Sequence, residues 1–283
     1  RTFAMKAPPI LTDQTDLSRH RARARTLADG HALFLHNAVL DEIQERLSEV
    51  NKAFTSPTIV TGWPEVWSAG GFDSSFCEDA DLLALQPGAH DLVIDALTIH
   101  WANDPVGRLV QMRRALRPDG LLIAALFGGQ TLHELRASLA EAEARVSGGL
   151  SPRVAPMAEI RDLGALLQRA GFALPVADSM SLTVSYESPR HLMRDLRAMG
   201  ETNALANRLR RPTSRAVLNE AARIYAENFP HGEGRIAATF EIILLTGWAP
   251  DESQQKPLRP GSAAQRLADA LGAAETPLSD DPV

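Results

Sequence analysis

DLVIDALTIHWAND, at residues 91–104, is the segment that best indicates the fold of this chain. Residues 91–97 form a short, almost continuous apolar run, which is typical of a strand covered on both faces of a parallel sheet. A helical segment follows from Pro105, since proline is favoured at the first position of a helix. A turn at 117–120 and a second apolar run at 121–127 complete a strand–helix–strand unit. These patterns predict an α/β protein with a central parallel sheet.

The composition of the chain sets limits on its class. A chain of 283 residues with 45% hydrophobic side chains can bury the core of one α/β domain with additions. Its formal net charge of −6 gives no general affinity for nucleic acid or anionic membranes. No apolar run is long enough to span a bilayer, no secretory signal pattern is seen, and Cys77 is the single cysteine. We therefore expect a cytoplasmic protein that binds no nucleic acid and is not an integral membrane protein.

Helical and strand patterns alternate along the rest of the chain. Residues 16–25 predict a short helix whose arginines are expected to be solvated, and 31–54 contain an amphipathic helix. The β-branched run 57–61 predicts a strand that Gly62 ends, and 75–77 predict a weaker strand. Further elements are expected as helices at 131–146, 157–170, 189–200 and 214–229 and as strands at 176–186 and 235–248.

Four stretches, taken together, occur in the order and at the spacing of a known family. They are LTIHWAND (97–104), FGGQTLHELR (127–136), GGLSPRVAP (148–156) and MGETN (199–203). From about residue 75 to residue 262 the chain resembles a methyltransferase-like family. Its members include the mitochondrial respiratory complex I assembly factors and, more distantly, the malonyl-carrier-protein methyltransferases of biotin synthesis.

The resemblance implies a Rossmann-like sheet of the class I S-adenosylmethionine-dependent methyltransferases, which is mostly parallel with an antiparallel last strand. It also implies a helical lid formed by insertions at about 131–156 and 189–229. The chain is then expected to divide into an N-terminal arm (1–30), a methyltransferase-like domain (31–248) and a mobile C-terminal tail (249–283).

The segment after the first strand departs from the family pattern. A cofactor loop needs glycines there, so that backbone N–H groups can approach the ligand, and only Gly62 is present. Trp63 is bulky, and Pro64 has no N–H to donate. Residues 62–90 have room for one strand–helix–strand crossover of on the order of 30 residues, but not for two. The sheet is therefore expected to lack its second strand unit, together with the acid that holds the cofactor ribose in the family.

Three positions are candidates for the remaining cofactor site. Gly62 could contact S-adenosylmethionine, or it could simply end a strand. Asp79 matches the family acid that contacts the adenine amino group, and it could equally be an exposed loop acid. The chain after Leu97 would supply the remaining contact.

His100 and Trp101 are the candidates for catalysis, because they follow a strand at the carboxyl edge where α/β sheets place their ligands. His100 could act as a general base and Trp101 could stack on a substrate, or both could pack beneath the lid. Arg153 could bind a carboxylate or phosphate of the substrate, or it could be an ordinary surface arginine. Glu201 and Asn203 could complete the substrate contact from the lid.

Two classes of function remain open at this stage. The first is an S-adenosylmethionine-dependent methyltransferase that modifies a respiratory-complex subunit or a small acid. The second is a non-catalytic assembly or scaffolding factor whose degenerate loop has lost cofactor binding. The histidines show no metal-ligand spacing, so no metal site is expected.

Overall fold

The computed structural model describes residues 10–27 and 30–254 of the chain. The chain divides after Pro250 into two units, and nearly all of the described residues belong to the first unit. The first residues of the predicted arm and most of the predicted tail lie outside the described residues.

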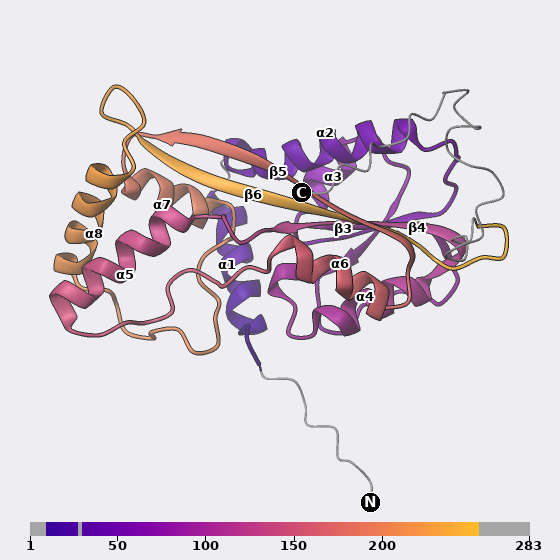
Figure 1. Ribbon diagram of the computed structural model, residues 1–283, viewed down its shortest axis with the longest axis horizontal. Helices are drawn as coiled ribbons and strands as arrows, with labels where there is room; N and C mark the ends of the chain where they lie inside the picture. The colour runs from indigo at the N-terminus through magenta and orange to yellow at the C-terminus, as the bar shows by residue number, and fades with distance from the viewer. Residues whose placement is uncertain (1–9, 28–29, 255–283) are drawn as a thin grey trace, which may run out of the picture. The chain divides into compact units, whose positions relative to one another are not determined.

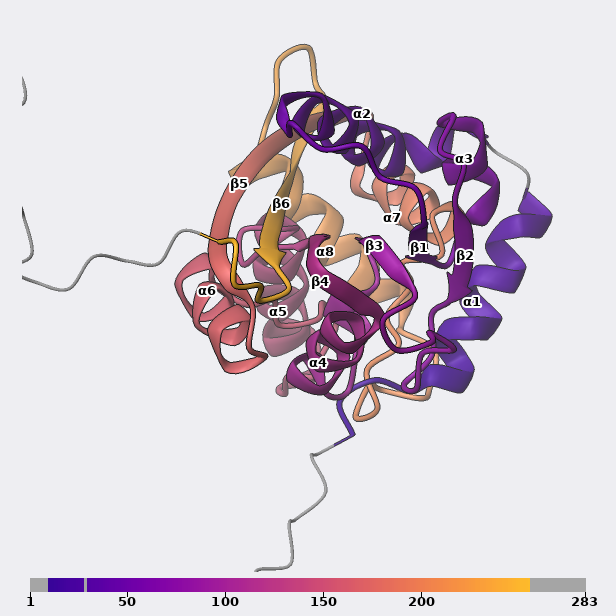
Figure 2. The same cartoon turned by 90° about the vertical axis from the view of Figure 1, so that its right-hand side faces the viewer.

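The centre of the first unit is a six-stranded sheet with the strand order β2-β1-β3-β4-β6-β5 (Figures 1 and 2). Strand β6 runs antiparallel to its neighbours β4 and β5, and the other five strands share one direction. The predicted Rossmann-like sheet, mostly parallel with an antiparallel last strand, is confirmed. The strands are β1 (Pro57–Thr61), β2 (Ser75–Glu78), β3 (His90–Ala96), β4 (Leu116–Phe127), β5 (Ala173–Tyr186) and β6 (Ile236–Trp248).

The sheet is shortened at the edge formed by β2 and β1, as the length of the segment 62–90 predicts. Strand β2 pairs directly with β1, with Ile59 opposite Phe76 and Val60 opposite Cys77. Between these two strands, residues 62–74 contain the short helix α3 (Pro64–Ala69) and no strand. The second strand unit of the usual sheet is therefore missing.

Helices cover both faces of the sheet (Figure 2). Because side chains alternate along a strand, Ile59 and Ile94 pack with α2 and α3, whereas Val60 and Val93 pack with α4 and α6. Among the described helices, none is both long and apolar enough to cross a bilayer. The remaining helices are α1 (Gln14–Leu27), α2 (Phe34–Glu49), α4 (Pro105–Ala115), α5 (His133–Ser147), α6 (Ile160–Arg169), α7 (Pro189–Ala198) and α8 (Arg215–Asn228), with single turns η1 (Gly30–Leu33) and η2 (Ile99–Trp101).

One predicted boundary is wrong. The turn expected at 117–120 lies within β4, which begins at Leu116. Asp119 has a left-handed backbone, with φ of 58°, and its N–H donates to the carbonyl of Ala249 at 3.1 Å. The N–H of Ala249 donates in return to the carbonyl of Gly120 at 2.8 Å. Backbone pairing with the segment after β6 thus holds the Pro-Asp-Gly sequence within the sheet.

Helices α5, α7 and α8 lie together beyond the carboxyl ends of β3 and β4 (Figure 1). They come from the two insertions, 131–156 and 189–229, that the sequence suggests as a lid. Their apolar faces share one core with the sheet, which includes Leu135, Leu192 and Ile224. The site is built at this junction.

Helix α1 packs on the domain beside β2 (Figure 2). Its buried side chains, Leu17, Arg21 and Ala24, recur at steps of four and three and so form one face of the helix. The prediction that the arginines of this helix are solvated is therefore wrong for Arg21, which is 6% exposed.

Candidate active site

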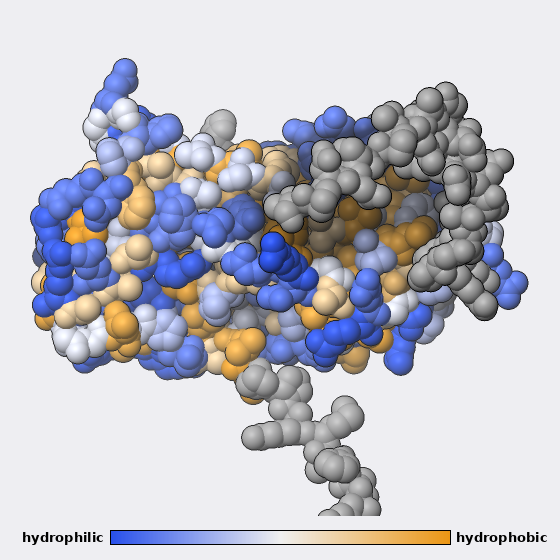
Figure 3. Space-filling view, in the orientation of Figure 1, coloured by the Kyte–Doolittle hydropathy of each residue, from blue (hydrophilic) through white to orange (hydrophobic). Residues whose placement is uncertain are grey.

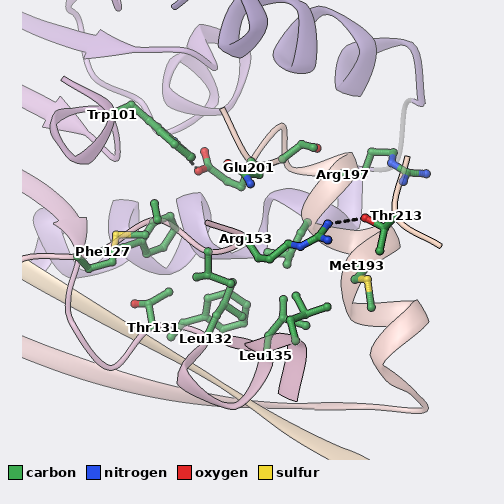
Figure 4. A pocket seen from close by; sticks show the side chains of 18 of the residues that line it. Trp101, Phe127, Thr131, Leu132, Leu135, Arg153, Met193, Arg197, Glu201 and Thr213 are labelled. Atoms are coloured by element: carbon green, nitrogen blue, oxygen red, sulfur yellow. Dashed lines mark hydrogen bonds between the residues drawn. The ribbon is translucent and has the colours of Figure 1, made fainter. Parts of the chain in front are cut away.

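A cavity of about 430 Å³, which we call the lid cavity, lies between the strand ends and helices α5, α7 and α8 (Figure 4). Its volume falls within the range of small-ligand pockets. The side chains at the strand ends are aromatic, and those from the helices are mostly aliphatic. The apolar lining includes Trp101, Phe127, Leu132, Leu135, Leu139, Met193, Leu196 and Phe240.

Glu201 is the acidic group at the inner end of the lid cavity, where it lies beside Trp101 (Figure 4). Trp101 Nε1 donates to Glu201 Oε2 at 2.7 Å, and His100 Nε2 lies 3.4 Å from the same oxygen. The turn η2 presents His100 and Trp101, while Glu201 follows helix α7. The fold thus brings together three of the predicted site residues that are about a hundred positions apart in the chain.

The carboxyl group of Glu201 is held in its charged form. Burial acts to raise its pKa, but the hydrogen bond and charge of His100, the charge of Arg21 and the bond from Trp101 together lower it. Among the described residues, no donor bonds to Glu201 Oε1. A charged oxygen with an open acceptor position therefore borders an apolar cavity.

Arg153 and Asn203 also line the lid cavity, but their polar groups are bound to the protein. Arg153 donates to Glu143 Oε1 at 2.7 Å. It also donates to the hydroxyl of Thr213, and Figure 4 shows this second bond as a dashed line. The amide of Asn203 donates to the carbonyl of Pro152 at 2.9 Å. These two residues join loops around the cavity.

Gly62 and Asp79 line a second cavity, of about 390 Å³, between α1 and the carboxyl ends of β1 and β2. Asp79 is not an exposed loop acid. Its Oδ2 accepts from Arg21 at 2.6 Å and its Oδ1 from Arg108 of α4 at 2.7 Å. Burial acts to raise the pKa of Asp79, but the two arginines lower it overall.

The Arg21 side chain passes between two glycines. A Cβ added to Gly62 would lie 2.9 Å from Arg21 Cζ, and one added to Gly200 would lie 3.0 Å from Arg21 Cγ. Trp63 is buried beside them, and its Cζ2 would lie 3.2 Å from a Cβ added to Gly200. The Arg25 guanidinium lies over the Trp63 ring. The Arg21 side chain therefore occupies the space directly against the Gly62 backbone, on one side of the second cavity.

Leu97, the third predicted cofactor contact, lies in the core that α2 and α3 share with the sheet. It is 2% exposed and has a left-handed backbone, with φ of 58°, which is uncommon for leucine. Its N–H donates to the carbonyl of Ala125 at 3.1 Å. The structure does not bring Leu97 together with the other candidates at either of these two cavities.

Three residues at or beside the second cavity were not recognised as candidates from the sequence. Arg21 is marked only by the burial spacing of its helix, and Gly200 only by its place in the MGETN stretch. Arg108 is marked only by its spacing of four and seven residues from the buried Met112 and Ala115 of α4. Across residues 10–27 and 30–254, no group of three or more His, Cys, Asp or Glu side chains could hold a metal ion.

Comparison with known proteins agrees with this topology. A sequence family described as a methyltransferase domain matches residues 39–124, which contain β1, β2, β3 and most of β4. The chain carries a class I methyltransferase-like domain. The resemblance inferred from the four sequence stretches is thus confirmed.

Curated relatives of this methyltransferase-like chain are of two kinds. Arginine-hydroxylase NDUFAF5 of Danio rerio is 42% identical over 194 residues, which are 68% of this chain and 59% of the relative. The Homo sapiens protein of the same name is 41% identical, covering 67% of this chain and 54% of the relative. Malonyl-[acyl-carrier protein] O-methyltransferase of Halorhodospira halophila is 34% identical, covering 64% of this chain and 59% of the relative. The match thus spans little more than half the length of each relative.

The predicted cytoplasmic location is contradicted by these comparisons. The NDUFAF5 relatives from Danio rerio, Dictyostelium discoideum, Mus musculus and Homo sapiens are all named as mitochondrial proteins. A single cysteine and the lack of a long apolar run do not distinguish between compartments, which is why the sequence argument failed.

The bond between Arg153 and Glu143 predicts a pH-dependent contribution to stability. The pKa of Glu143 is about 2, below its ordinary value of 4.5, and the main cause is the hydrogen bond from Arg153. This contribution is therefore complete above pH 4.5 and is lost as the pH falls towards 2. We expect Glu143→Gln to lower the free energy of unfolding by about 2 kcal/mol at neutral pH. The difference from wild type should vanish in acid, as measured by urea unfolding at a series of pH values.

Glu141→Gln is the matched control for this prediction, because Glu141 lies on the same helix in an exposed pair with Arg145. Exposed pairs contribute about 0–1 kcal/mol, so its effect should be smaller. If the difference in free energy of unfolding between Glu143→Gln and wild type stays constant down to pH 2, the bond between Arg153 and Glu143 is not its source.

Proposed function

We propose that this chain binds an arginine side chain of a partner protein in the lid cavity and modifies that residue. The observation that carries the proposal is Glu201, a charged carboxylate with an open oxygen, which lies beside Trp101 at the end of a largely apolar cavity. A desolvated carboxylate is best satisfied by a planar cation that can donate hydrogen bonds, and the guanidinium group is that cation in proteins.

The walls of the lid cavity suit the other parts of an arginine side chain. Leu135 and Leu196 offer apolar surface to its methylene stem. Trp101, which holds one oxygen of Glu201, also lines the cavity, and its indole ring can attract a guanidinium through its π face. The Glu201 carboxylate and the Trp101 ring would together recognise both the charge and the plane of the group.

The names of the relatives support an arginine ligand and suggest the reaction. The proteins from Danio rerio and Homo sapiens are named as arginine hydroxylases. We propose the same class of modification here, on an arginine of a protein that is assembled into a respiratory complex. The reaction replaces one C–H bond by C–OH, so it needs dioxygen and a two-electron reductant as co-substrates, and the second oxygen atom leaves as water. The predicted lid is part of this proposal, since the insertions supply the walls of the cavity and Glu201 itself.

A conventional methyl transfer is disfavoured by the second cavity. S-adenosylmethionine would need the backbone at Gly62, which the Arg21 side chain covers, and the carboxylate of Asp79, which two arginines occupy. We infer that the family's cofactor site is degenerate in this chain. His100 then serves to hold Glu201, and its other nitrogen, Nδ1, is buried without a partner.

A small acid is the second candidate ligand, and the arginines at the lid cavity favour it. Arg197 lines the cavity without an ion pair among the described residues. Arg153 offers less to a carboxylate ligand, because Glu143 already neutralises it. The two candidates demand opposite charges at opposite ends of the same cavity, so binding experiments distinguish them.

Glu201→Gln tests the arginine proposal. We expect it to weaken binding of an arginine-containing peptide by about one to two decades, because it removes a charged hydrogen bond worth roughly 1.5–3 kcal/mol. Replacing the arginine of the peptide by citrulline, which is uncharged, should weaken binding to wild type by a similar factor. Fluorescence anisotropy with labelled peptides gives both dissociation constants.

Glu45→Gln, at an exposed position on α2, is the control and should bind like wild type. Equal binding of the arginine and citrulline peptides would contradict the proposal, and tighter binding of a small acid would favour the second candidate. Mass spectrometry of the peptide, after incubation with the protein, dioxygen, a reductant and S-adenosylmethionine, then identifies the reaction. A gain of one oxygen atom supports hydroxylation, a gain of one methylene supports methyl transfer, and binding without change supports the non-catalytic assembly factor.

Calorimetric titration with S-adenosylhomocysteine tests the degenerate cofactor site. We expect wild type to show no saturation below about millimolar ligand, since several charged or close backbone contacts are lost. Arg21→Ala should bind about tenfold more tightly, because it uncovers Gly62 and one oxygen of Asp79. Arg23→Ala, at an exposed site on the same helix, should behave like wild type. Saturable micromolar binding to wild type would contradict the inference.

A further inference from the structure

Helix α7 carries a row of arginines on one face. Arg190, Arg194 and Arg197 are spaced by four and three residues, which places them along one side of a helix. Arg215, the first residue of α8, lies beside them, and all four line a groove of about 280 Å³. We call this surface, made by Arg190, Arg194, Arg197 and Arg215, the arginine groove.

The charges of the arginine groove are not balanced within the described part of the chain. There, Arg194, Arg197 and Arg215 take part in no ion pair or hydrogen bond through their guanidinium groups. Arg190 donates only to the neutral amide of Asn219, at 2.7 Å. All four arginines are exposed.

The acids on the two helices are engaged elsewhere. Asp195, the only acid on α7, accepts from the hydroxyl of Tyr186 at 2.6 Å. Glu220 and Glu227 of α8 pair with Arg223. Like charges four residues apart destabilise a helix by several tenths of a kcal/mol, so this row is unfavourable for the isolated protein. On a chain of net charge −6, it marks a local surface that suits a negatively charged partner.

The arginine groove and the lid cavity adjoin each other. Both are lined by Met193, Arg197 and Leu218. In Figure 4, Met193 and Arg197 lie toward the Thr213 end of the cavity, away from Trp101. The visible surface over α5, α7 and α8 is largely hydrophilic with scattered apolar residues (Figure 3). A peptide lying in the groove would therefore pass over the outer end of the lid cavity.

We propose that the arginine groove docks an acidic segment of the partner protein next to the residue that enters the lid cavity. The identity of that entering residue rests on the proposed function, whereas the docking of acidic flanks does not. Glu201 would select the inserted side chain by its positive charge, and the groove would select the surrounding sequence by its negative charge. The substrate is then a basic residue within an acidic stretch.

Three peptides and one double variant test this docking site. The peptides share one length and carry arginine with glutamate flanks, arginine with glutamine flanks, or citrulline with glutamate flanks. The variant R194E/R215E reverses two groove charges and leaves Arg197, which also lines the lid cavity, unchanged. R161E/R169E is the matched control, since Arg161 and Arg169 are exposed on α6 and their side chains make no ion pair or hydrogen bond among the described residues.

Glutamate flanks should tighten binding to wild type and to R161E/R169E by about tenfold at low salt, and this gain should disappear at high salt. In R194E/R215E the gain should be absent. A flank effect that is missing in wild type, or that R161E/R169E abolishes equally, overturns the docking proposal.

The peptide set also separates this proposal from the arginine proposal. If citrulline binds as well as arginine while the flank effect still needs the groove, docking stands and arginine recognition fails. Vesicles containing phosphatidylserine provide the last comparison. If they bind wild type and lose binding to R194E/R215E while acidic peptides do not bind at all, the groove faces a membrane and the docking proposal is overturned.

Discussion

The carboxylate of Asp79, enclosed by two buried arginines, ties together segments that are distant in the chain. Arg21 reaches it from α1 at 2.6 Å and Arg108 from α4 at 2.7 Å, and each of the three side chains is less than a tenth exposed. Arg108 also lies 3.9 Å from Asp95 on β3. Removing one partner from a buried pair typically costs about 3–5 kcal/mol, because the other charge is left uncompensated. The position of α1 on the domain therefore depends on this cluster.

The missing strand unit gives the cluster its place in the fold. Since β2 pairs directly with β1, the acid after β2 lies close to the end of β1 and to α1. Arg21 then fills the space between Gly62 and Gly200. Gly200 has a φ of 79°, so glycine is favoured there both by conformation and by the close approach of Arg21. The next residue, Glu201, enters the lid cavity, which links the Asp79 cluster to the proposed binding site.

Much of the fold could be predicted from local patterns, and the site only in part. The apolar runs at 91–97 and 121–127 identified the buried strands, and counting residues 62–90 revealed the missing unit. His100, Trp101 and Glu201 could be named as candidates because they lie in stretches that resemble a known family. Their meeting at one carboxylate could not be foreseen, since it depends on how α7 packs against the strand ends.

The errors have the same physical origin. Arg21 looked solvated because arginines two residues apart scatter around a helix, and only a partner from a distant loop makes its burial favourable. The alternative that Asp79 is an exposed loop acid failed for the same reason, because Arg21 and Arg108 reach it from distant helices and bury it. The Pro-Asp-Gly sequence at 118–120 looked like a turn, yet pairing with the chain after β6 keeps it in a strand. Sequence patterns report local preference, whereas these outcomes depend on long-range partners.

The central claim is that α1 closes the cofactor end of a methyltransferase-like domain. A crystal structure of the protein grown with excess S-adenosylhomocysteine tests it most directly. The account predicts that the Arg21 side chain remains between Gly62 and Gly200, bonded to Asp79, with no nucleoside density at the ends of β1 and β2. A nucleoside bonded to Asp79, with Arg21 displaced from Gly62, would contradict the account.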